Sequence, residues 1–408
     1  MRGLLVYPIR SDFEPIRGLV NKMEYQRAGF AELVERADLV CNSLRAPIYN
    51  GGELSRYLGG PSRVARVVHH YGTFFLKIVR EIPIETYDFF YIRFPGSSPM
   101  FVGFLAELRR RNRRAKIVLE VPTYPFKAEA KTFSQKLILA SNELTQPLLK
   151  RYVDFIVTFF GQRSIYGIDC VATSNGVDVT RLPVNSRRER SGGLRLLGVA
   201  NLAEWHGYDR VIRGLAEEGS AKSVEFDIVG DGPERRALET LASSLGVVDR
   251  VHFHGVKTGA ALDAMFSACD LAVGSLGMHR LALGTASSLK TREYCARGIP
   301  FVLGNPDADF PEGWPFAFRI VSDESPLNVG ALTEAFGAMS EAYPDYPLRM
   351  RRYSEERLTW AGKLRPVVDR IRSELGSLGE DARSGATSNG AGQGHAGFHG
   401  TEPSSGHL

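Results

Sequence analysis

The sequence predicts an α/β protein with two domains, each built on a parallel sheet with helices on both faces. Its 408 residues exceed the roughly 100–200 residues of a typical single domain. Short apolar runs alternate with amphipathic stretches along most of the chain, a pattern typical of parallel sheets. At Ser174–Asp178 this pattern stops, and Pro183 and a polar run up to Gly193 follow. We therefore expect a linker over 174–193 between the two domains.

The composition is that of an ordinary globular protein. Apolar residues make up 43% of the chain, enough for two cores. The cysteines are far apart and form no Cys-x-x-Cys pair, so we expect reduced thiols rather than a disulfide scaffold or a zinc ribbon. The N-terminal apolar run is too short for a signal peptide, and no run of about 18 apolar residues predicts a membrane helix. These features predict a cytoplasmic protein. The cysteines are Cys41, Cys170, Cys269 and Cys295.

The first domain is expected over residues 1–173. Val20–Ala37 has the apolar spacing of a helix, and a second helical stretch ends in the cluster Arg109–Arg114. Between and beyond these stretches, short apolar runs predict strands. The expected strands are Gly3–Pro8, Asp88–Phe94, Lys116–Val121, Asp154–Thr158 and Cys170–Thr173.

The second domain is expected over residues 194–345, with a helical segment over 346–375 that packs back on the first domain. Residues 376–408 are rich in Gly, Ser, Ala and Asn and predict a disordered tail. The second domain has the outline of a mononucleotide-binding fold. Its expected strands are Leu194–Ala200, Val224–Val229, Val251–Phe253, Leu271–Gly274 and Pro300–Gly304, and its expected helices are Asp209–Glu217, Pro233–Leu245, Ala260–Ala268, Lys290–Arg297 and, at the end, Leu348–Leu375.

The arginine cluster Arg109–Arg114 has two interpretations. Cations are favoured at the C-terminal end of a helix, so the cluster fits a solvated helix end. It also fits a peripheral contact with anionic lipid at the inner face of the plasma membrane, through Arg109, Arg110, Arg111, Arg113 and Arg114. Nucleic acid is not expected as a partner, because no aromatic residues interleave with the arginines and the formal charge is only +5.

Loops that follow the strands of the second domain are expected to form a ligand site, since ligands of open parallel sheets bind beyond the carboxyl ends of the strands. These loops are Asn201–Gly207, Gly230–Glu234, His254–Lys257 and a long loop that runs to Ser288. They converge on one edge of the predicted sheet.

The long loop is the most specific of these features. Gly284–Leu289 leads into a helix, and free amides at a helix N-terminus next to small residues form an anion site suited to a diphosphate. Lys290 would add a point charge there, and Glu293 lies one turn further on the same face. A carboxylate at Glu293 could accept hydrogen bonds from both ribose hydroxyls. The alternatives are a solvated surface cation at Lys290 and a salt-bridge carboxylate at Glu293.

The run GTASSLKTREYCARGIPFVLG resembles the donor-site signature of the retaining GT-B glycosyltransferase family 4 (group 1 glycosyltransferases). The runs VEFDIVGDGPERRALETLASSLGVVDRVHFHG and NLAEWHGYDRVIRGL are similar to neighbouring segments of the same family, and EVPTYPF, DFFYIRFP and SNGVDV to its polysaccharide-assembly branch. The resemblance implies two Rossmann-like domains that face across a cleft. It also implies transfer of a sugar from a nucleotide-sugar donor to a glycan or lipid-linked glycan in polysaccharide biosynthesis.

The resemblance assigns roles to individual residues. Glu293 matches the second glutamate of the family's Glu-x7-Glu element and would bind the donor ribose. The amides of Ser288 and Leu289 would face the diphosphate. Gly255, Val256 and Lys257 match the segment that frames the nucleobase, and Gly232 matches a turn glycine.

Two departures from the family pattern stand out. Thr285 occupies the position of the first glutamate of Glu-x7-Glu, and Asn201 and His206 replace an arginine and a lysine that face the diphosphate. Lys290 is therefore expected to be the principal fixed cation, and a protonated His206 would partly replace the missing lysine. Negative charge builds on the leaving diphosphate, and its electrostatic stabilisation is the expected main catalytic effect.

No metal and no cofactor beyond the nucleotide sugar is expected, because the sequence has no histidine-rich cluster with metal-ligand spacing, and the resemblance implies a metal-independent reaction. The acceptor is expected on the side of the first domain. Glu120 ends an apolar strand, where a carboxylate needs a partner; it is either a catalytic residue, with Lys290 and Glu293, or a buried partner of Arg93. The other candidates on the acceptor side are Gly18, Arg93, Thr123 and Tyr124.

Two other functions share the expected fold. A sugar-nucleotide 2-epimerase would act on the nucleotide sugar itself, without an acceptor. A catalytically impaired binding protein would keep the fold, and Thr285 favours that alternative. The donor sugar, its base and the acceptor are left open by the sequence.

Overall fold

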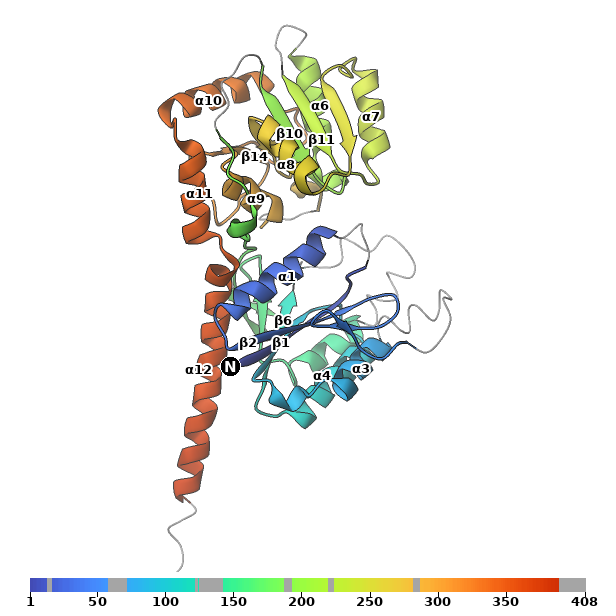
Figure 1. The fold of residues 1–408 in the computed structure, drawn as a ribbon, viewed down its shortest axis with the longest axis vertical. Coiled ribbons are helices and arrows are strands. Elements are labelled where there is room, and N and C mark those ends of the chain that lie inside the picture. Colours follow the sequence, from blue (N-terminus) through green and yellow to red (C-terminus); the bar gives the residue numbers. More distant parts are fainter. Residues whose placement is uncertain are drawn as a thin grey trace, which may run out of the picture.

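The structure is a computed structural model that describes residues 1–12, 17–57, 72–121, 124, 142–186, 193–218, 224–281 and 287–388. It consists of two α/β domains, one above the other in Figure 1, joined by two passages of the chain. The predicted fold class is confirmed: each domain is a mainly parallel sheet between helices. Predicted site residues Thr123 and Thr285 lie outside the described residues.

The sheet of the N-terminal domain has the order β4-β3-β2-β1-β5-β6-β7-β9-β8. The pairs from β2 to β9 are parallel, and β3, β4 and β8 are short antiparallel additions. The strands are β1 Arg2–Arg10, β2 Arg36–Asn42, β3 Ile48–Tyr49, β4 Gly52–Glu53, β5 Phe89–Arg93, β6 Lys116–Val121, β7 Phe155–Thr158, β8 Ser164–Ile165 and β9 Ile168–Ala172, and the helices are α1 Arg17–Ala31, α3 Phe74–Glu81, η3 Ile84–Thr86 and α4 Pro99–Arg111.

Apolar side chains of this sheet pack on both faces. One face, with Leu4, Phe90 and Ile117, packs against α3 and α4. The other face, with Leu5 and Tyr91, packs against α1 and against the C-terminal helix of the chain. Burial on both faces explains why its central strands read as almost continuous apolar runs.

One predicted helix of this domain was too long. The helix predicted over Val20–Ala37 ends at Ala31, and Ala37 belongs to β2, a strand that the sequence analysis did not predict. Leu33 and Ala37 continue the apolar spacing of the helix and are buried in the same core. Periodicity alone therefore cannot locate the end of this helix.

The sheet of the C-terminal domain has the order β12-β11-β10-β13-β14-β15, with parallel pairs throughout. This is the strand order of a dinucleotide-binding Rossmann sheet. Its strands are β10 Arg195–Val199, β11 Glu225–Val229, β12 Val251–Gly255, β13 Leu271–Val273, β14 Phe301–Leu303 and β15 Ala317–Arg319, and its helices are η6 Glu204–His206, α6 Tyr208–Glu217, α7 Arg235–Ser244, α8 Gly259–Ala268, η7 Met278–Leu281, α9 Leu289–Arg297 and α10 Val329–Ala342; η5 Val179–Arg181 lies in the linker.

The single helix predicted over Leu348–Leu375 is two helices, α11 (Tyr346–Arg357) and α12 (Trp360–Ser388). The chain breaks at Leu358, whose carbonyl accepts a hydrogen bond from the backbone N–H of Val177 in the linker. Helix α11 contacts α9 in the C-terminal domain, and α12 packs against α1 of the N-terminal domain, as Figure 1 shows. Trp360, Leu364 and Ile371 enter the N-terminal core.

Helix α12 continues past Leu375 to Ser388, where a disordered tail was predicted from Gly376. A helix already fixed by packing adds a hydrogen bond with each further residue, so it can extend into a polar sequence.

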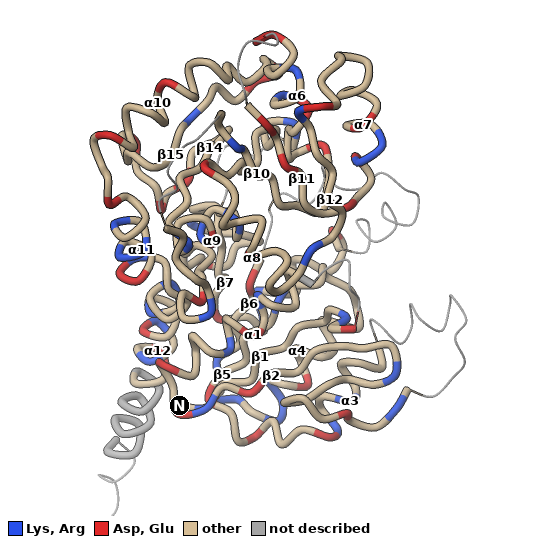
Figure 2. Tube along the Cα trace, turned by 45° about the horizontal axis from the view of Figure 1, so that its top comes forward, with Lys and Arg blue, Asp and Glu red and all other residues tan. Residues whose placement is uncertain are grey.

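In Figure 2, basic and acidic residues are interspersed over both domains. None of the described helices is both long enough and apolar enough to cross a membrane.

Candidate functional site

The loops after β10, β11 and β12 meet at the carboxyl edge of the C-terminal sheet. The backbone N–H of Leu202, after β10, donates to the carbonyl of Asp231, after β11, at 2.8 Å. The N–H of Gly230 donates to the carbonyl of Gly255, at the end of β12, also at 2.8 Å. The convergence expected from the sequence is thus made by direct backbone hydrogen bonds.

Two glycines permit this close approach. Gly230 and Gly232 have φ of 126° and 155°, and a Cβ on Gly230 would lie 1.8 Å from the carbonyl oxygen of Ala200. A Cβ on Gly232 would lie 2.4 Å from the carbonyl oxygen of Leu202 and 2.9 Å from Oδ1 of Asn201. Any larger residue would push these loops apart, so the site needs glycine at both positions.

The loop after β13 joins the same edge. Its residue Leu276 donates its backbone N–H to the carbonyl of His206 at 2.9 Å, and Gly277 donates to the carbonyl of Trp205 at 3.2 Å. Gly207, at φ 63°, has no room for a side chain because a Cβ would lie 2.7 Å from the amide nitrogen of Gly277. This loop leads through residues outside the described part of the chain to α9.

Lys290 lies in the first turn of α9 at this edge. Its Nζ is buried and has no hydrogen-bond partner among the described residues. The amine lies 5.7 Å from the centroid of the Tyr208 ring. Burial lowers the pKa of Lys290 to about 7, because a desolvated amine favours its neutral form. The solvated surface cation, which was the alternative interpretation, does not describe this side chain.

His206 is neutral, contrary to the prediction that it replaces a missing cation. Burial, and then the nearby charge of Lys290, lower the pKa of His206 to about 2. Nδ1 of His206 accepts a hydrogen bond from the backbone N–H of Ala203 at 3.1 Å. The ring proton of the neutral imidazole is therefore on Nε2, which makes this residue a hydrogen-bond donor and not a second cation.

Glu293 makes the salt bridge that the sequence analysis held as its alternative. Nε of Arg297 donates to Oε1 of Glu293 at 2.9 Å, and Arg297 also pairs with Asp263 at 2.8 Å. Burial raises the pKa of Glu293, although a third of the side chain is exposed. The charge of Glu293 also helps to raise the pKa of Tyr25 on α1, after burial and the effects of the linker charges. Glu293 therefore lies near the boundary between the domains.

The start of α9 is fixed to the rest of the protein on two sides. Leu289 packs against the core cluster that contains Trp360 of α12. Ser287, just before Ser288, accepts a hydrogen bond at Oγ from the backbone N–H of Asn175 in the linker at 2.8 Å. The carbonyl of Ser288 accepts from Oγ1 of Thr291 at 2.9 Å. The N-terminus of α9 is thus held where linker, crossover helix and site meet.

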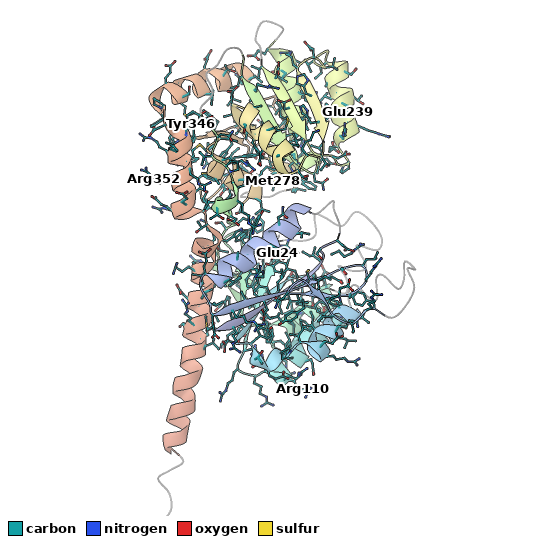
Figure 3. The ribbon with its side chains drawn as sticks, viewed as in Figure 1. Glu24, Arg110, Glu239, Met278, Tyr346 and Arg352 are labelled. Carbon is teal, nitrogen blue, oxygen red and sulfur yellow. The ribbon has the colours of Figure 1, made fainter. Side chains whose placement is uncertain are left out.

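The predicted nucleobase segment lies at the outer end of the same edge. Gly255 has φ 65° and turns the chain away from β12. Val256 is 69% exposed, which is unusual for a valine, and Lys257 is exposed as well. In Figure 3, Met278 of this domain and Glu24 of α1 lie on either side of the boundary between the domains.

Glu120 in the N-terminal domain is fully buried and has four hydrogen-bond donors. They are Nζ of Lys22 at 3.0 Å, Nη1 of Arg93 at 2.6 Å, Nε2 of Gln26 at 2.6 Å and the hydroxyl of Tyr91 at 2.7 Å. Burial alone would raise the pKa of Glu120, but the charges of Lys22 and Arg93 outweigh it and lower the pKa to about 2. This arrangement favours the buried partner of Arg93 over a catalytic acid or base.

The other candidates on the acceptor side lie apart from this cluster. Gly18 is exposed with open space around it. It lies inside the first turn of α1, because this helix begins at Arg17, before the predicted helix start at Val20. The ring of Tyr124 packs edge-on against Tyr166, with centroids 5.8 Å apart, at the border of the core below α3 and α4. The structure does not bring Gly18 and Tyr124 together with Arg93 by any described contact.

The arginine cluster is mostly engaged by its own domain. Arg109 binds Asp154 at 2.7 Å, Arg110 binds Glu107 at 2.6 Å, and Arg111 pairs with Glu85. Helix α4 ends at Arg111, so the helix-end interpretation describes these residues. In Figure 3, Arg110 lies at the end of the N-terminal domain far from the C-terminal domain.

Sequence reasoning missed three residues of the two sites. Lys22 and Gln26 are four residues apart on α1 and share one face. The available sign was two long polar residues on the buried side of an amphipathic helix. Arg292 is fully buried and pairs with Asp307 and Asp309. The acidic pair Asp307-x-Asp309 after a buried strand was the sign of that network.

Comparisons with known proteins bear on the superfamily and on the fold. The family model for glycosyl transferases group 1 matches residues 185–312, which cover most of the C-terminal domain. The lipopolysaccharide core biosynthesis glycosyltransferase LpsD of Rhizobium meliloti (strain 1021) is 37% identical over 65 residues. That match spans 16% of this chain and 18% of LpsD, less than a fifth of the relative's length.

Solved structures resemble the whole chain. WaaG, a glycosyltransferase involved in lipopolysaccharide biosynthesis, has a TM-score of 0.58 and 16% identity, over 91% of this chain and 99% of WaaG. Anabaena Alr3699/HepE in complex with UDP has a TM-score of 0.52 and 14% identity, over 94% of this chain and all of HepE. The likeness confirms the GT-B fold, and the family match supports the glycosyltransferase superfamily.

Proposed function

We propose that this protein is a glycosyltransferase that moves a sugar from a nucleotide-sugar donor to a glycan or lipid-linked glycan acceptor. We further propose that it acts with retention, in the biosynthesis of a cell-surface polysaccharide. The observation that carries the proposal is the buried amine of Lys290, which has no partner among the described residues and lies at the N-terminus of α9.

A buried amine without a partner is unfavourable, since it loses hydration and gains no hydrogen bond. An anion beside it would supply the missing charge and acceptor oxygens. The N-terminus of a helix offers free amides to the same anion, here those of Leu289 and Lys290. A diphosphate fits both features, and the solved complex of HepE with UDP supports a nucleoside diphosphate as the ligand.

The other residues of the edge fit the rest of a nucleotide sugar. Val256 presents an exposed apolar surface beside Gly255 and Lys257, which suits the flat face of a nucleobase. Glu293 would leave Arg297, or share it, to accept hydrogen bonds from the ribose hydroxyls. His206, with its proton on Nε2, would donate to a phosphate or sugar oxygen, as would the amide of Asn201. By the family resemblance, Thr285 would contribute a hydroxyl to the transferred sugar.

In the proposed reaction, the bond between the anomeric carbon and the diphosphate breaks while negative charge builds on the leaving oxygen. Lys290 in its charged form and the amides at the start of α9 would stabilise this charge. One such contact is worth roughly 2.7–4 kcal/mol in comparable sites. We propose that no metal is required. Glu120, neither exposed nor open to another donor, would act through Lys22 and Arg93.

Turnover separates this proposal from its alternatives. A transferase releases nucleoside diphosphate only when an acceptor is present, whereas an epimerase changes the nucleotide sugar without one. An impaired binding protein would bind the nucleotide and release no product. The names of LpsD and WaaG support lipopolysaccharide-type acceptors, and exposed Arg113 and Arg114 would supply any remaining contact with anionic lipid at the inner face of the plasma membrane.

The test is the binding of UDP, GDP, ADP and CDP, and of their sugars, by thermal shift, because a ligand of the folded state alone raises its apparent stability. We expect one nucleoside diphosphate to raise the Tm of the wild type and of the control Lys150→Met, which removes an exposed lysine. Lys290→Met and Glu293→Gln should each lose most of that shift. Wild-type binding and turnover in both variants would refute the proposed site.

A further inference from the structure

Glu120 and its donors lie at the carboxyl edge of the N-terminal sheet. Arg93 is the last residue of β5 and pairs in register with Glu120 of the neighbouring β6. Lys22 reaches the same carboxylate from α1, the helix that lies between this sheet and the C-terminal domain in Figure 1. Ligands of parallel sheets bind at such an edge.

The charges of this cluster do not cancel. Lys22 is 5% exposed and Arg93 15%, and Glu120 is the one acidic side chain that either contacts among the described residues. Gln26 is uncharged, and the hydroxyls of Tyr7 and Tyr91 stay neutral, because burial raises the pKa of both well above its usual range. Two cations against one carboxylate leave a buried surplus of one positive charge.

Such a surplus is costly in a buried place. Its cost is visible at Lys22, since burial lowers the pKa of this amine to about 8 in spite of the adjacent carboxylate. One cation would suffice to balance Glu120, and Gln26 and Tyr91 complete its hydrogen bonds. Among the described residues, none accounts for the second cation.

Arg93 is the more exposed of the two cations. Its guanidinium donates to Glu120 through Nη1 only, among the described residues. A guanidinium has five N–H donors in a planar fork, so donors remain for a second oxyanion. Arginine forks bind phosphate and carboxylate groups in bidentate fashion.

The cluster also lies close to the candidate donor site. Nζ of Lys22 is 4.3 Å from the ring centroid of Phe159 and 5.7 Å from that of Trp360. Leu289, at the start of α9, packs against the core cluster that includes Trp360. The surplus charge and the unpartnered amine of Lys290 thus flank the same boundary between the domains, from opposite sides.

We infer that Arg93, supported by Lys22, binds an anionic group of the acceptor, a phosphoryl or a carboxyl group, with Glu120 as the fixed counter-charge. This inference rests on the proposed glycosyltransferase function, and it specifies an acidic acceptor. Glu120 then orients the two cations and is a positioning residue, not a group that touches the sugar.

The test uses inorganic phosphate as the probe, with acetate as a second arm and chloride at equal ionic strength as the reference. Phosphate should raise the Tm of the wild type, and Arg93→Gln should raise the Kd for phosphate at least about tenfold, as loss of a charge-assisted hydrogen-bond pair implies. Arg93→Lys, which keeps the charge, should retain part of the binding. Acetate replaces phosphate only if the site takes a carboxyl group.

Lys290→Met separates the two sites. In Lys290→Met, phosphate binding that depends on Arg93 should persist while nucleoside diphosphate binding is lost; Arg93→Gln should show the reverse. In transfer assays, Arg93→Gln should raise KM for the acceptor and leave KM for the donor within about twofold. If Arg93→Gln binds phosphate and acetate as tightly as the wild type does, the inference is overturned. Loss of nucleotide binding in every protein would instead refute the proposed function.

Discussion

Each domain has a buried ionisable group at the carboxyl edge of its parallel sheet, and the two groups differ in their hydrogen-bond partners. Glu120 in the N-terminal domain receives hydrogen bonds from Lys22, Gln26, Tyr91 and Arg93. Nζ of Lys290 in the C-terminal domain donates no hydrogen bond to the described residues. The carboxylate of Glu120 thus has all its partners within the chain, whereas the amine of Lys290 has none among the described residues.

The pKa of each group reflects this difference. The pKa of Glu120 is lowered to about 2, so the fold holds it charged. The pKa of Lys290 is lowered to about 7, so the fold disfavours its charge. A buried charge with a full set of partners stabilises a structure, whereas a buried charge without them marks a position prepared for a ligand.

The largest expected effect is at Glu120. Glu120→Gln leaves Lys22 and Arg93 buried without a counter-charge, and breaking such a group typically costs about 3–5 kcal/mol. Urea denaturation should show that loss in the free energy of unfolding. The control Glu24→Gln removes an exposed carboxylate of α1, the helix that carries Lys22, and should change stability by less than about 0.5 kcal/mol. Equal stability of the two variants would contradict a structural role for Glu120.

The pH dependence of the free energy of unfolding tests the contribution of Glu120 in the wild type itself. The folded pKa of Glu120, about 2, lies below its usual value of about 4.3. The stability that this carboxylate contributes is therefore complete above about pH 4.3, and it is lost as the pH falls toward 2. Wild type and Glu120→Gln should converge in stability over that range.

The charge of Lys290 has the opposite effect on the free energy of unfolding, because it destabilises the fold. Its folded pKa of about 7 lies below the usual value of about 10.4, so the charged amine destabilises the fold in full below pH 7, and the cost fades as the pH rises toward 10.4. Lys290→Met should raise the free energy of unfolding without ligand by about 0.5–2 kcal/mol, as removal of a strained functional group commonly does. Denaturation at pH 6 and pH 9 measures it; a destabilised variant at pH 6 would contradict the account.

The sequence predicted the second domain more closely than the first. The strands and helices of residues 194–304 lie within a few residues of their predicted limits, because each is bounded by glycine, proline or a turn. In the first domain, β2 follows α1 after a short turn that keeps the apolar spacing of the helix. The start of β2 therefore could not be located from the sequence. In the second domain, the three-residue strand β15 was not predicted.

The candidate site was predicted in its position and not in its electrostatics. Lys290 and Glu293 could be placed at a helix N-terminus from local sequence alone. That Lys290 has no partner, that His206 is neutral and that Glu293 binds Arg297 depends on burial by residues far away in the chain. Likewise Lys22 meets Glu120 across 98 positions of sequence, a contact that no local pattern reveals.

The smallest effect is expected at exposed cations. Arg113→Gln with Arg114→Gln removes charges that are exposed at the end of α4, so stability should change by less than about 0.5 kcal/mol. Sedimentation with anionic vesicles should fall if these residues contact lipid, while nucleotide affinity stays the same. A change in nucleotide affinity would show that the comparison of buried and exposed charges misses a coupling between the sites.

The most direct test of the central claim is proton uptake when the preferred nucleoside diphosphate binds, measured by calorimetry at pH 8 in two buffers of different ionisation enthalpy. The free amine of Lys290, with a pKa of about 7, is mostly neutral at pH 8 and should become charged beside a diphosphate. The account predicts net proton uptake by the wild type, and weaker binding without uptake by Lys290→Met. Binding without proton uptake, or equal uptake by both proteins, would contradict it.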